Sequence, residues 1–346
     1  MSNPGASKIT VQWRMSDPPV VARSWHRWGQ ASTGLGSDLG TEASLGWEPG
    51  AIAALRAGFA HKLGRSVGWE SEMDSVHAAA RVFKRGVASR APGGSETSRE
   101  VSGEYEIVIE PDDGFLNLSE DEFTVIDGHV AQAWPHLKLG SRSLSLTLDE
   151  QSKTLESVAQ IINAAKACGT VRSWRVIGGG LLTDVVAFAA ALQNTPINFV
   201  PTTLLAMADA CIGGKTGVNF APFGKNQVGR FYFPERVSIW TGWLATLPDR
   251  ELIGGGAECL KHAFLRGDEA LAQHLADALS RRDLKSLASL LPDVISLKAE
   301  VVREDPTENG KRAILNLGHT LAHALEGYAH ARLSGGQTLT HGEAVG

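Results

Sequence analysis

From residue 105 onward, apolar positions recur in short runs that alternate with stretches of helical spacing. The runs that predict strands cover 105–109, 122–127, 173–177 and 197–200. An amphipathic helix is predicted over 155–167, and a buried, alanine-rich helix over 184–192. Strand, helix and strand in this order are typical of a parallel sheet, so we expect an α/β domain here.

After Pro248 the strand signal disappears. The remaining apolar positions follow helical spacing and predict helices over 250–265, 269–280, 283–290, 293–303 and 313–328. Residues 1–104 differ from both parts: they hold five of the nine tryptophans, two predicted helices (51–63 and 73–87) and a Gly/Ser-rich linker over 88–103. We therefore divide the chain into an atypical extension and linker (1–104), an α/β domain (105–247) and a helical domain (248–346).

Composition narrows the class of protein. The 346 residues are 43% hydrophobic, which suffices for buried cores, and the net charge of −5 argues against a general nucleic-acid binder. Three widely spaced cysteines provide neither a disulfide framework nor a CxxC zinc site. No apolar run reaches the roughly 18 residues that cross a bilayer, and the first twenty residues lack a signal-peptide core. We expect a cytoplasmic protein without a membrane partner.

Histidines near the C-terminal end indicate a metal site. His319 and His323 are four residues apart, so on a helix they share one face and could bind one divalent cation, with His341 as a further ligand. A surface or core packing role is the alternative for such a pair. Glu258 and Lys261 would likewise share a helix face, and taken alone they are more often a solvated ion pair.

A triple glycine follows the strand predicted over 173–177. Gly178, Gly179 and Gly180 would let the backbone approach a pyrophosphate, although a tight structural turn is the alternative because the GxGxxG spacing is incomplete. Asp127, at the end of another strand, could accept a ribose hydroxyl or simply end a strand at the surface. The segment 213–216 lacks the first glycine of a Walker motif, so an ATPase is not expected.

Taken in order, the motifs between residues 105 and 346 resemble the sugar phosphate cyclases, and among them the 3-dehydroquinate synthases. The motifs are GGGLLTD (178–184), PTTLLAMAD (201–209), GGKTGVN (213–219), GKN (224–226), LPDREL (247–252), AECLK (257–261), KAEVV (298–302), RAILNLGHTLAHALE (312–326) and HGEAVG (341–346). The resemblance implies a Rossmann-like NAD-binding α/β domain followed by a helical metal- and substrate-binding domain. Family members continue past the position of residue 346, so the helical domain is expected to be incomplete.

The resemblance also implies ligands and site residues. It implies NAD and one divalent metal, zinc or cobalt, with Glu258, His319 and His341 as the metal ligands. The residues in NAD-contacting positions are Asp127, Glu150, Lys153, Gly178, Gly179, Gly180, Asp184, Thr202, Thr203, Lys215, Lys225, Thr246 and Glu251. The residues in substrate-contacting positions are Asp209, Lys215, Asn226, Lys261, Lys298, Arg312, Asn316 and His323.

The activity implied is a carbon–oxygen lyase of the shikimate pathway. It would convert 3-deoxy-D-arabino-heptulosonate 7-phosphate to 3-dehydroquinate and phosphate, by transient oxidation by NAD, phosphate elimination and an intramolecular aldol step. The expected partners are this small sugar phosphate and a second copy of the chain in a homodimer. Two alternatives remain: a cyclase acting on sedoheptulose 7-phosphate, or a non-catalytic relic of the family that acts as a binding module.

Overall fold

The computed structural model describes residues 6–16, 100–116, 119–220, 224–319, 322 and 341–345. Three of the predicted features lie outside these residues: the helices over 51–63 and 73–87, and the part of the last predicted helix that contains His323. Among the described helices, none combines the length and the apolar character needed to cross a bilayer.

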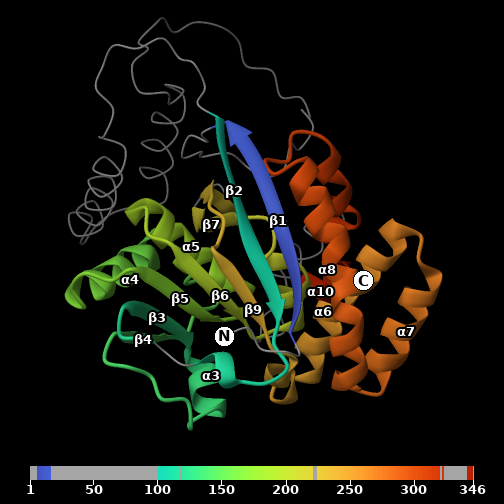
Figure 1. Cartoon of the computed structure of the whole chain (residues 1–346), viewed down its shortest axis with the longest axis horizontal. Coiled ribbons are helices and arrows are strands. Elements are labelled where there is room, and N and C mark those ends of the chain that lie inside the picture. Colours follow the sequence, from blue (N-terminus) through green and yellow to red (C-terminus); the bar gives the residue numbers. More distant parts are fainter. Residues whose placement is uncertain are drawn as a thin grey trace, which may run out of the picture.

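A seven-stranded sheet forms the centre of the molecule (Figure 1). Its order is β1-β2-β9-β6-β5-β3-β4, and all neighbours are parallel except β1 and β2. The strands are β1 (Ser7–Ser16), β2 (Glu100–Ile109), β3 (Glu122–Asp127), β4 (Ser143–Leu146), β5 (Ser173–Gly178), β6 (Ile197–Pro201) and β9 (Arg236–Ile239). The predicted parallel sheet is thus confirmed.

Helices cover the sheet because its central strands are apolar on both faces. In β3, for example, Phe123, Val125 and Ile126 are fully buried, as expected for a parallel strand between two layers. The covering helices are α3 (Gly128–Ala133), α4 (Leu155–Ala167) and α5 (Gly180–Gln193). A separate antiparallel pair, β7 (Lys215–Phe220) and β8 (Gly224–Phe231), packs against α5.

The chain after Pro248 is helical, as predicted. In Figure 1 its helices gather beside β1 and β2, and α8 packs on β1. They are α6 (Asp249–Arg266), α7 (Glu269–Ser280), α8 (Leu284–Glu304) and α10 (His341–Val345), and short turns form η1 (Gly114–Leu116), η2 (π-helical, Ala206–Ala210), η3 (Thr241–Ala245) and η4 (Lys311–Asn316).

Several sequence-based boundaries differ from the structure. The helices predicted over 283–290 and 293–303 are one helix, α8, which continues through Pro292 because its buried face, including Leu291 and Ile295, packs on the core. The helix predicted from residue 313 instead starts as the 3-10 turn η4, and it is interrupted at Gly318, whose φ is 81°. Helix α5 starts four residues earlier than expected, at Gly180.

The predicted extension contributes a strand to the sheet. Residues 7–16 form β1, which pairs antiparallel with β2 along its whole length. The linker predicted over 88–103 is wrong at its end, because β2 begins at Glu100. Trp13, stacked on Phe233 with ring centroids 4.5 Å apart, fixes β1 to the loop after β8. The division between 105–247 and 248–346 stays a prediction.

Candidate functional site

The glycine triplet lies where parallel strands β3, β5 and β6 end side by side. A Cβ atom on Gly178 would lie 3.3 Å from Asp127 Cβ, and one on Gly179 would lie 3.1 Å from Thr203 Cγ2. Gly180 is the first residue of α5, and no described side chain caps that helix. A close backbone approach and an uncapped helix N-terminus are what a dinucleotide pyrophosphate requires. The triplet therefore has the backbone geometry that the predicted dinucleotide site needs.

Asp127 caps helix α3, in addition to its predicted contact with a ribose hydroxyl. Its Oδ1 accepts a hydrogen bond of 2.8 Å from the backbone N–H of His129, so it caps α3. Thr202 follows directly after β6, and its N–H donates to Gly178 O at 3.0 Å. Asp127, Thr202 and Thr203 therefore surround the glycine triplet, as the prediction of a nucleotide site requires.

Lys153 joins residues from three distant parts of the chain. Its buried Nζ donates to Asp184 Oδ2 at 2.7 Å and to Asn226 Oδ1 at 2.6 Å. Burial raises the pKa of Asp184, and the attraction of Lys153 offsets only part of this shift. The three predicted residues thus form one partly buried polar network beside the first turns of α5.

The hairpin β7–β8 brings Asn219 to this network. Asn219 Nδ2 donates to both the carbonyl and Oε1 of Glu150 at 2.8 Å, and its Oδ1 accepts from the N–H of Asn226 at 2.8 Å. Lys225 Nζ lies 3.9 Å from Glu150 Oε2. The sequence reasoning quoted Asn219 within a motif but gave it no role, because its partner Glu150 is 69 residues away.

Thr246 and Glu251 lie where η3 leads into α6. Thr246 Oγ1 accepts a hydrogen bond of 2.9 Å from Trp134 Nε1, at the end of α3. Trp134 packs edge-on against Trp243, with ring centroids 5.0 Å apart. Glu251 is exposed in the first turn of α6, and no described hydrogen bond joins it to the glycine triplet.

The helical domain supplies buried cations, each with an acid or carbonyl partner. Lys298 Nζ donates to the main-chain O of Asp209 at 2.6 Å and contacts its carboxylate. Lys261 Nζ donates to Leu315 O at 2.8 Å and forms an ion pair with Glu258. Burial lowers the pKa of Lys298, although Asp209 counteracts it. Burial would raise the pKa of Asp209, but Lys298, Lys261 and His262 together hold it well below its ordinary value.

Arg312 is only 2% exposed and lies against a glycine. Its Nη1 donates to Pro306 O at 2.6 Å, and its guanidinium lies 5.8 Å from the centre of the Phe231 ring. Gly213, with φ 108°, passes so close that a Cβ atom there would be 2.3 Å from Arg312 Nη2. Burial lowers the pKa of Arg312.

Glu308 is a site residue that the sequence reasoning missed. It forms an ion pair with Lys215, and its Oε1 accepts from Asn316 Nδ2 at 2.7 Å. Burial and the neighbouring Arg312 lower the pKa of Lys215 to about 8, although Glu308 counteracts them. Glu308 has a positive φ of 59°, which its sequence context, Glu308-Asn309-Gly310, does not predict.

Two of the predicted metal ligands, Glu258 and His319, lie close together. Glu258 is fully buried, and its Oε1 lies 3.7 Å from His319 Nε2. Two ligand atoms about 2.0–2.2 Å from one tetrahedral zinc ion are separated by about 3.4 Å, so this pair fits two corners of a metal site. The backbone of His341 begins α10, which packs against α6. The side chains of His341 and His323 lie outside the described part of the chain.

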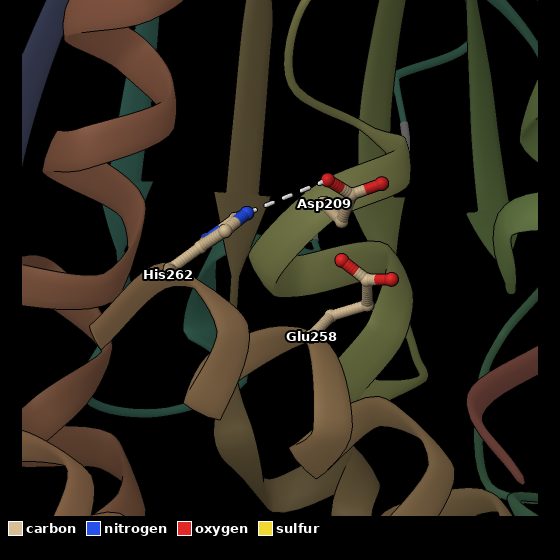
Figure 2. Close-up of side chains that lie close together, drawn as sticks. All are labelled: Asp209, Glu258 and His262. Atoms are coloured by element: carbon tan, nitrogen blue, oxygen red, sulfur yellow. Dashed lines mark ion pairs between the residues drawn. The ribbon is translucent and has the colours of Figure 1, made fainter. Parts of the chain in front are cut away.

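His262 completes a group that the sequence reasoning did not identify. Figure 2 shows the side chains of Asp209, Glu258 and His262 pointing toward one another. Their potential ligand atoms lie within 4.8 Å of one another. Burial lowers the pKa of His262 to about 4, so its ring is neutral near pH 7. The spacing of Glu258 and His262, four residues on one helix, is the signal that could have found it.

One contact joins the nucleotide side of the site to the metal side. A Cβ atom on Gly180 would lie 3.0 Å from the Cβ of Ala210, the residue after Asp209. Asp209 itself is paired with Lys298 and faces His262 at 3.7 Å. The glycine triplet, the carboxylate–imidazole group and the buried cations therefore occupy one continuous region.

Comparison with known proteins gives a consistent family. Residues 143–254 match the model of the 3-dehydroquinate synthase N-terminal domain, and residues 255–346 match that of its C-terminal domain. The 3-dehydroquinate synthase of Salinibacter ruber is 44% identical over 59% of this chain and 56% of its own length. That of Caulobacter vibrioides is 40% identical over 70% of each chain. The chain thus spans little more than half the length of the first of these relatives.

The solved structures similar to this chain include two sugar phosphate cyclases. The 2-epi-5-epi-valiolone synthase ValA of Streptomyces hygroscopicus, with NAD+ and Zn2+ bound, has a TM-score of 0.60 and 29% identity over 74% of each chain. A 2-deoxy-scyllo-inosose synthase complexed with carbaglucose-6-phosphate, NAD+ and Co2+ has a TM-score of 0.55 and 26% identity over 70% of each chain. An NADH-dependent butanol dehydrogenase of Thermotoga maritima, at 14% identity and a TM-score of 0.50, shares the fold alone.

Proposed function

Because the chain belongs to the 3-dehydroquinate synthase family, we propose that it converts 3-deoxy-D-arabino-heptulosonate 7-phosphate to 3-dehydroquinate and phosphate, using NAD and one divalent metal ion. One observation carries the proposal beyond family membership. Gly180, at the start of α5, packs on Ala210, and the adjacent Asp209 is paired with Lys298 and close to Glu258 and His262. The residues that we assign to the nucleotide and to the metal are therefore contiguous.

The residues present suit both cofactors. The glycine triplet with Asp127 and Thr203 would hold NAD, while Glu258 and His319 would hold zinc or cobalt, since carboxylate oxygen and imidazole nitrogen are ligands that both ions accept. When bound, the two groups supply a reversible hydride acceptor and a Lewis acid for substrate oxygens. The structural relatives bound to NAD+ with Zn2+ or Co2+ support this assignment.

Buried cations provide the anion recognition. A substrate with a phosphate and a carboxylate brings negative charges into a region where Lys298 and Arg312 are buried and Lys215 is half-buried, and charge–charge attraction is stronger there than in solvent. Arg312 presents a planar fork of donors suited to a carboxylate or phosphate. We assign these three residues to the anionic groups of the substrate.

Lys215 has the protonation behaviour expected of a proton donor at neutral pH. Its pKa of about 8 lets the Nζ atom hold a proton near pH 7 and release it readily. A departing phosphate needs a proton as its carbon–oxygen bond breaks, so Lys215 is the residue we assign to that transfer. Asp209, held ionised by its cationic neighbours, orients substrate hydroxyls by accepting their hydrogen bonds.

The decisive test is release of phosphate by the full chain. With 3-deoxy-D-arabino-heptulosonate 7-phosphate, NAD and Co2+, we expect phosphate release that a chelator abolishes and added metal restores. The overall reaction is redox-neutral, so substoichiometric NAD should suffice. Glu258→Gln should eliminate release, whereas Glu300→Gln, at an exposed ion pair with Arg266, should not change it.

Other outcomes of this assay separate the alternatives. Release from sedoheptulose 7-phosphate but not from the heptulosonate would assign the chain to another branch of the cyclases. A folded protein that binds NAD and Co2+ but releases no phosphate from either would be a binding module. We also propose that the chain acts in the cytoplasm as a homodimer; light scattering that gives the mass of one chain would refute the dimer.

A further inference from the structure

His262 is a buried imidazole whose polar atoms are unsatisfied. The residue is 1% exposed, and neither Nδ1 nor Nε2 has a hydrogen-bond partner within the described part of the chain. Buried polar groups in folded proteins are nearly always hydrogen-bonded, because removing them from water without a partner is costly. Both ring nitrogens of His262 are therefore available to bind a ligand.

The surroundings of His262 define what that ligand is. His262 follows Glu258 by one turn of α6, and Asp209 projects from η2 toward its ring, with Nε2 and Oδ1 3.7 Å apart (Figure 2). Ligand atoms about 2.1 Å from one ion lie about 3.4 Å apart in a tetrahedral site, and about 4.2 Å apart when they are trans to each other in an octahedral site. The three groups, within 4.8 Å of one another, need only a small closure to share an ion.

We propose that Asp209, Glu258 and His262 form a second position for a divalent cation of the zinc or cobalt type, adjacent to the predicted position and sharing Glu258 with it. The inference deepens the proposed function, since it adds to the same site. The second position differs from the predicted one in its ligands, because it includes neither His319 nor His341. Two carboxylate oxygens and one imidazole nitrogen leave coordination positions open for water or substrate oxygens.

Two lysines neutralise the carboxylates of this position when no cation is bound. Lys298 pairs with Asp209, and Lys261 pairs with Glu258, so the two carboxylates are neutralised by two ammonium groups. An entering dication displaces these ammonium groups from the carboxylates. Lys261 retains Leu315 O as an acceptor, and Lys298 retains the main-chain O of Asp209. The released positive charge lies near Arg312, so cation binding here and anion binding nearby strengthen each other.

The test measures binding of Co2+ alone to the full chain, by isothermal titration and by visible absorption of the bound ion. In the His341→Ala background, which breaks the predicted position, we expect one equivalent of Co2+ to remain. Adding His262→Gln should lower the remaining affinity at least tenfold and change the absorption bands. His274→Gln, at an exposed histidine on α7, is the matched control and should change neither.

A second variant guards against a folding artefact. Asp209→Asn in the same background should also weaken Co2+ binding, and circular dichroism of each metal-free variant should match that of the parent. The inference is overturned if His341→Ala alone abolishes Co2+ binding, or if His262→Gln and Asp209→Asn leave the affinity unchanged.

These results are independent of the assay for the proposed function. If the wild-type chain releases phosphate but the second-position variants keep the parent Co2+ affinity, only the inference fails. If the wild-type chain releases no phosphate but His262→Gln weakens Co2+ binding, the proposed function fails and the cation position stands.

Discussion

Replacing Gly213 by alanine tests whether the buried Arg312 is as confined as the structure indicates. A Cβ atom at position 213 would lie 2.3 Å from Arg312 Nη2, 2.9 Å from its Cζ and 3.0 Å from Val302 Cγ2. The guanidinium has almost no exposed surface, so it cannot turn into solvent to avoid the methyl group. The substitution must therefore displace Arg312 or the backbone.

Gly213→Ala should lower the free energy of unfolding for two reasons. The φ of 108° is a region that residues with a side chain rarely adopt, and strain of this kind costs about 1–3 kcal/mol. Displacing Arg312 weakens its hydrogen bond to Pro306 O, and a charge-assisted bond contributes about 1.5–3 kcal/mol. We expect the free energy of unfolding to fall by about 3–5 kcal/mol.

Gly224 provides a matched control for the backbone cost. Its φ is 112°, and no described atom lies within 4 Å of a Cβ atom built there. Gly224→Ala should therefore lose only about 1–3 kcal/mol. Urea unfolding at pH 7, analysed by linear extrapolation with similar m-values, gives both numbers. If the two variants differ by less than about 0.5 kcal/mol, Arg312 is not confined, and its assignment as a fixed anion-binding residue is wrong.

Three further changes have defined outcomes. Lys153→Met removes the donor shared by Asp184 and Asn226, so NAD affinity should fall about tenfold in calorimetric titration; unchanged affinity would contradict the network's role. Burial lowers the pKa of Lys215 from 10.5 to about 8 in the folded chain, so the unfolded chain holds this proton more tightly. Between these two pH values the free energy of unfolding should therefore rise with pH, while the rate of phosphate release declines. Lys215→Arg should lose both trends. Saturating Co2+ at one hundred times its Kd should add about 2.7 kcal/mol of stability to the chelator-treated protein, and Glu258→Gln should show much less of this gain in thermal unfolding.

Local patterns in the sequence predicted the parts of the fold that depend on local interactions. The helix predicted over 155–167 is α4 with the same ends, because its apolar face is regular and Thr154 caps it by accepting from the N–H of Ser157. The strands β3, β5 and β6 were found for a related reason: each is a short apolar run buried on both faces. The helices after Pro248 were found by their spacing, although their junction at Pro292 was not.

Long-range interactions determined what the local patterns missed. Strand β1 lies in a segment rich in tryptophan and glycine, and it becomes a strand by pairing with β2 across a gap of more than eighty residues. The hairpin β7–β8 was missed because its glycines interrupt the alternation: a Cβ atom on Gly217 would lie 2.9 Å from Val228 O across the pair. Glu308 gained its role only through Lys215 and Asn316, which no local pattern pairs with it. His262 could have been found from its spacing to Glu258, but its approach to Asp209 depends on the packing of α6 against η2.

The ordered motifs, by contrast, indicated much of the site before any geometry was known. The network of Lys153, Asp184 and Asn226 and the pairs Asp209–Lys298 and Glu258–His319 all join residues that the family resemblance had assigned. Their assignment to NAD, metal or substrate stays a prediction, since contacts within the chain establish proximity and not ligand identity.

The distribution of buried charge explains why such a site is kept at a cost to stability. Burying an ion pair often stabilises a fold no more than well-packed apolar residues would, yet this chain buries Lys298, Lys261 and Arg312 in one region. Each has a partner within the chain: Asp209 for Lys298, Glu258 for Lys261 and the Pro306 carbonyl for Arg312. The same groups can exchange these internal partners for a cation and for substrate anions. Apolar replacements would pack well but could make neither exchange, so the costly arrangement is best explained by ligand binding.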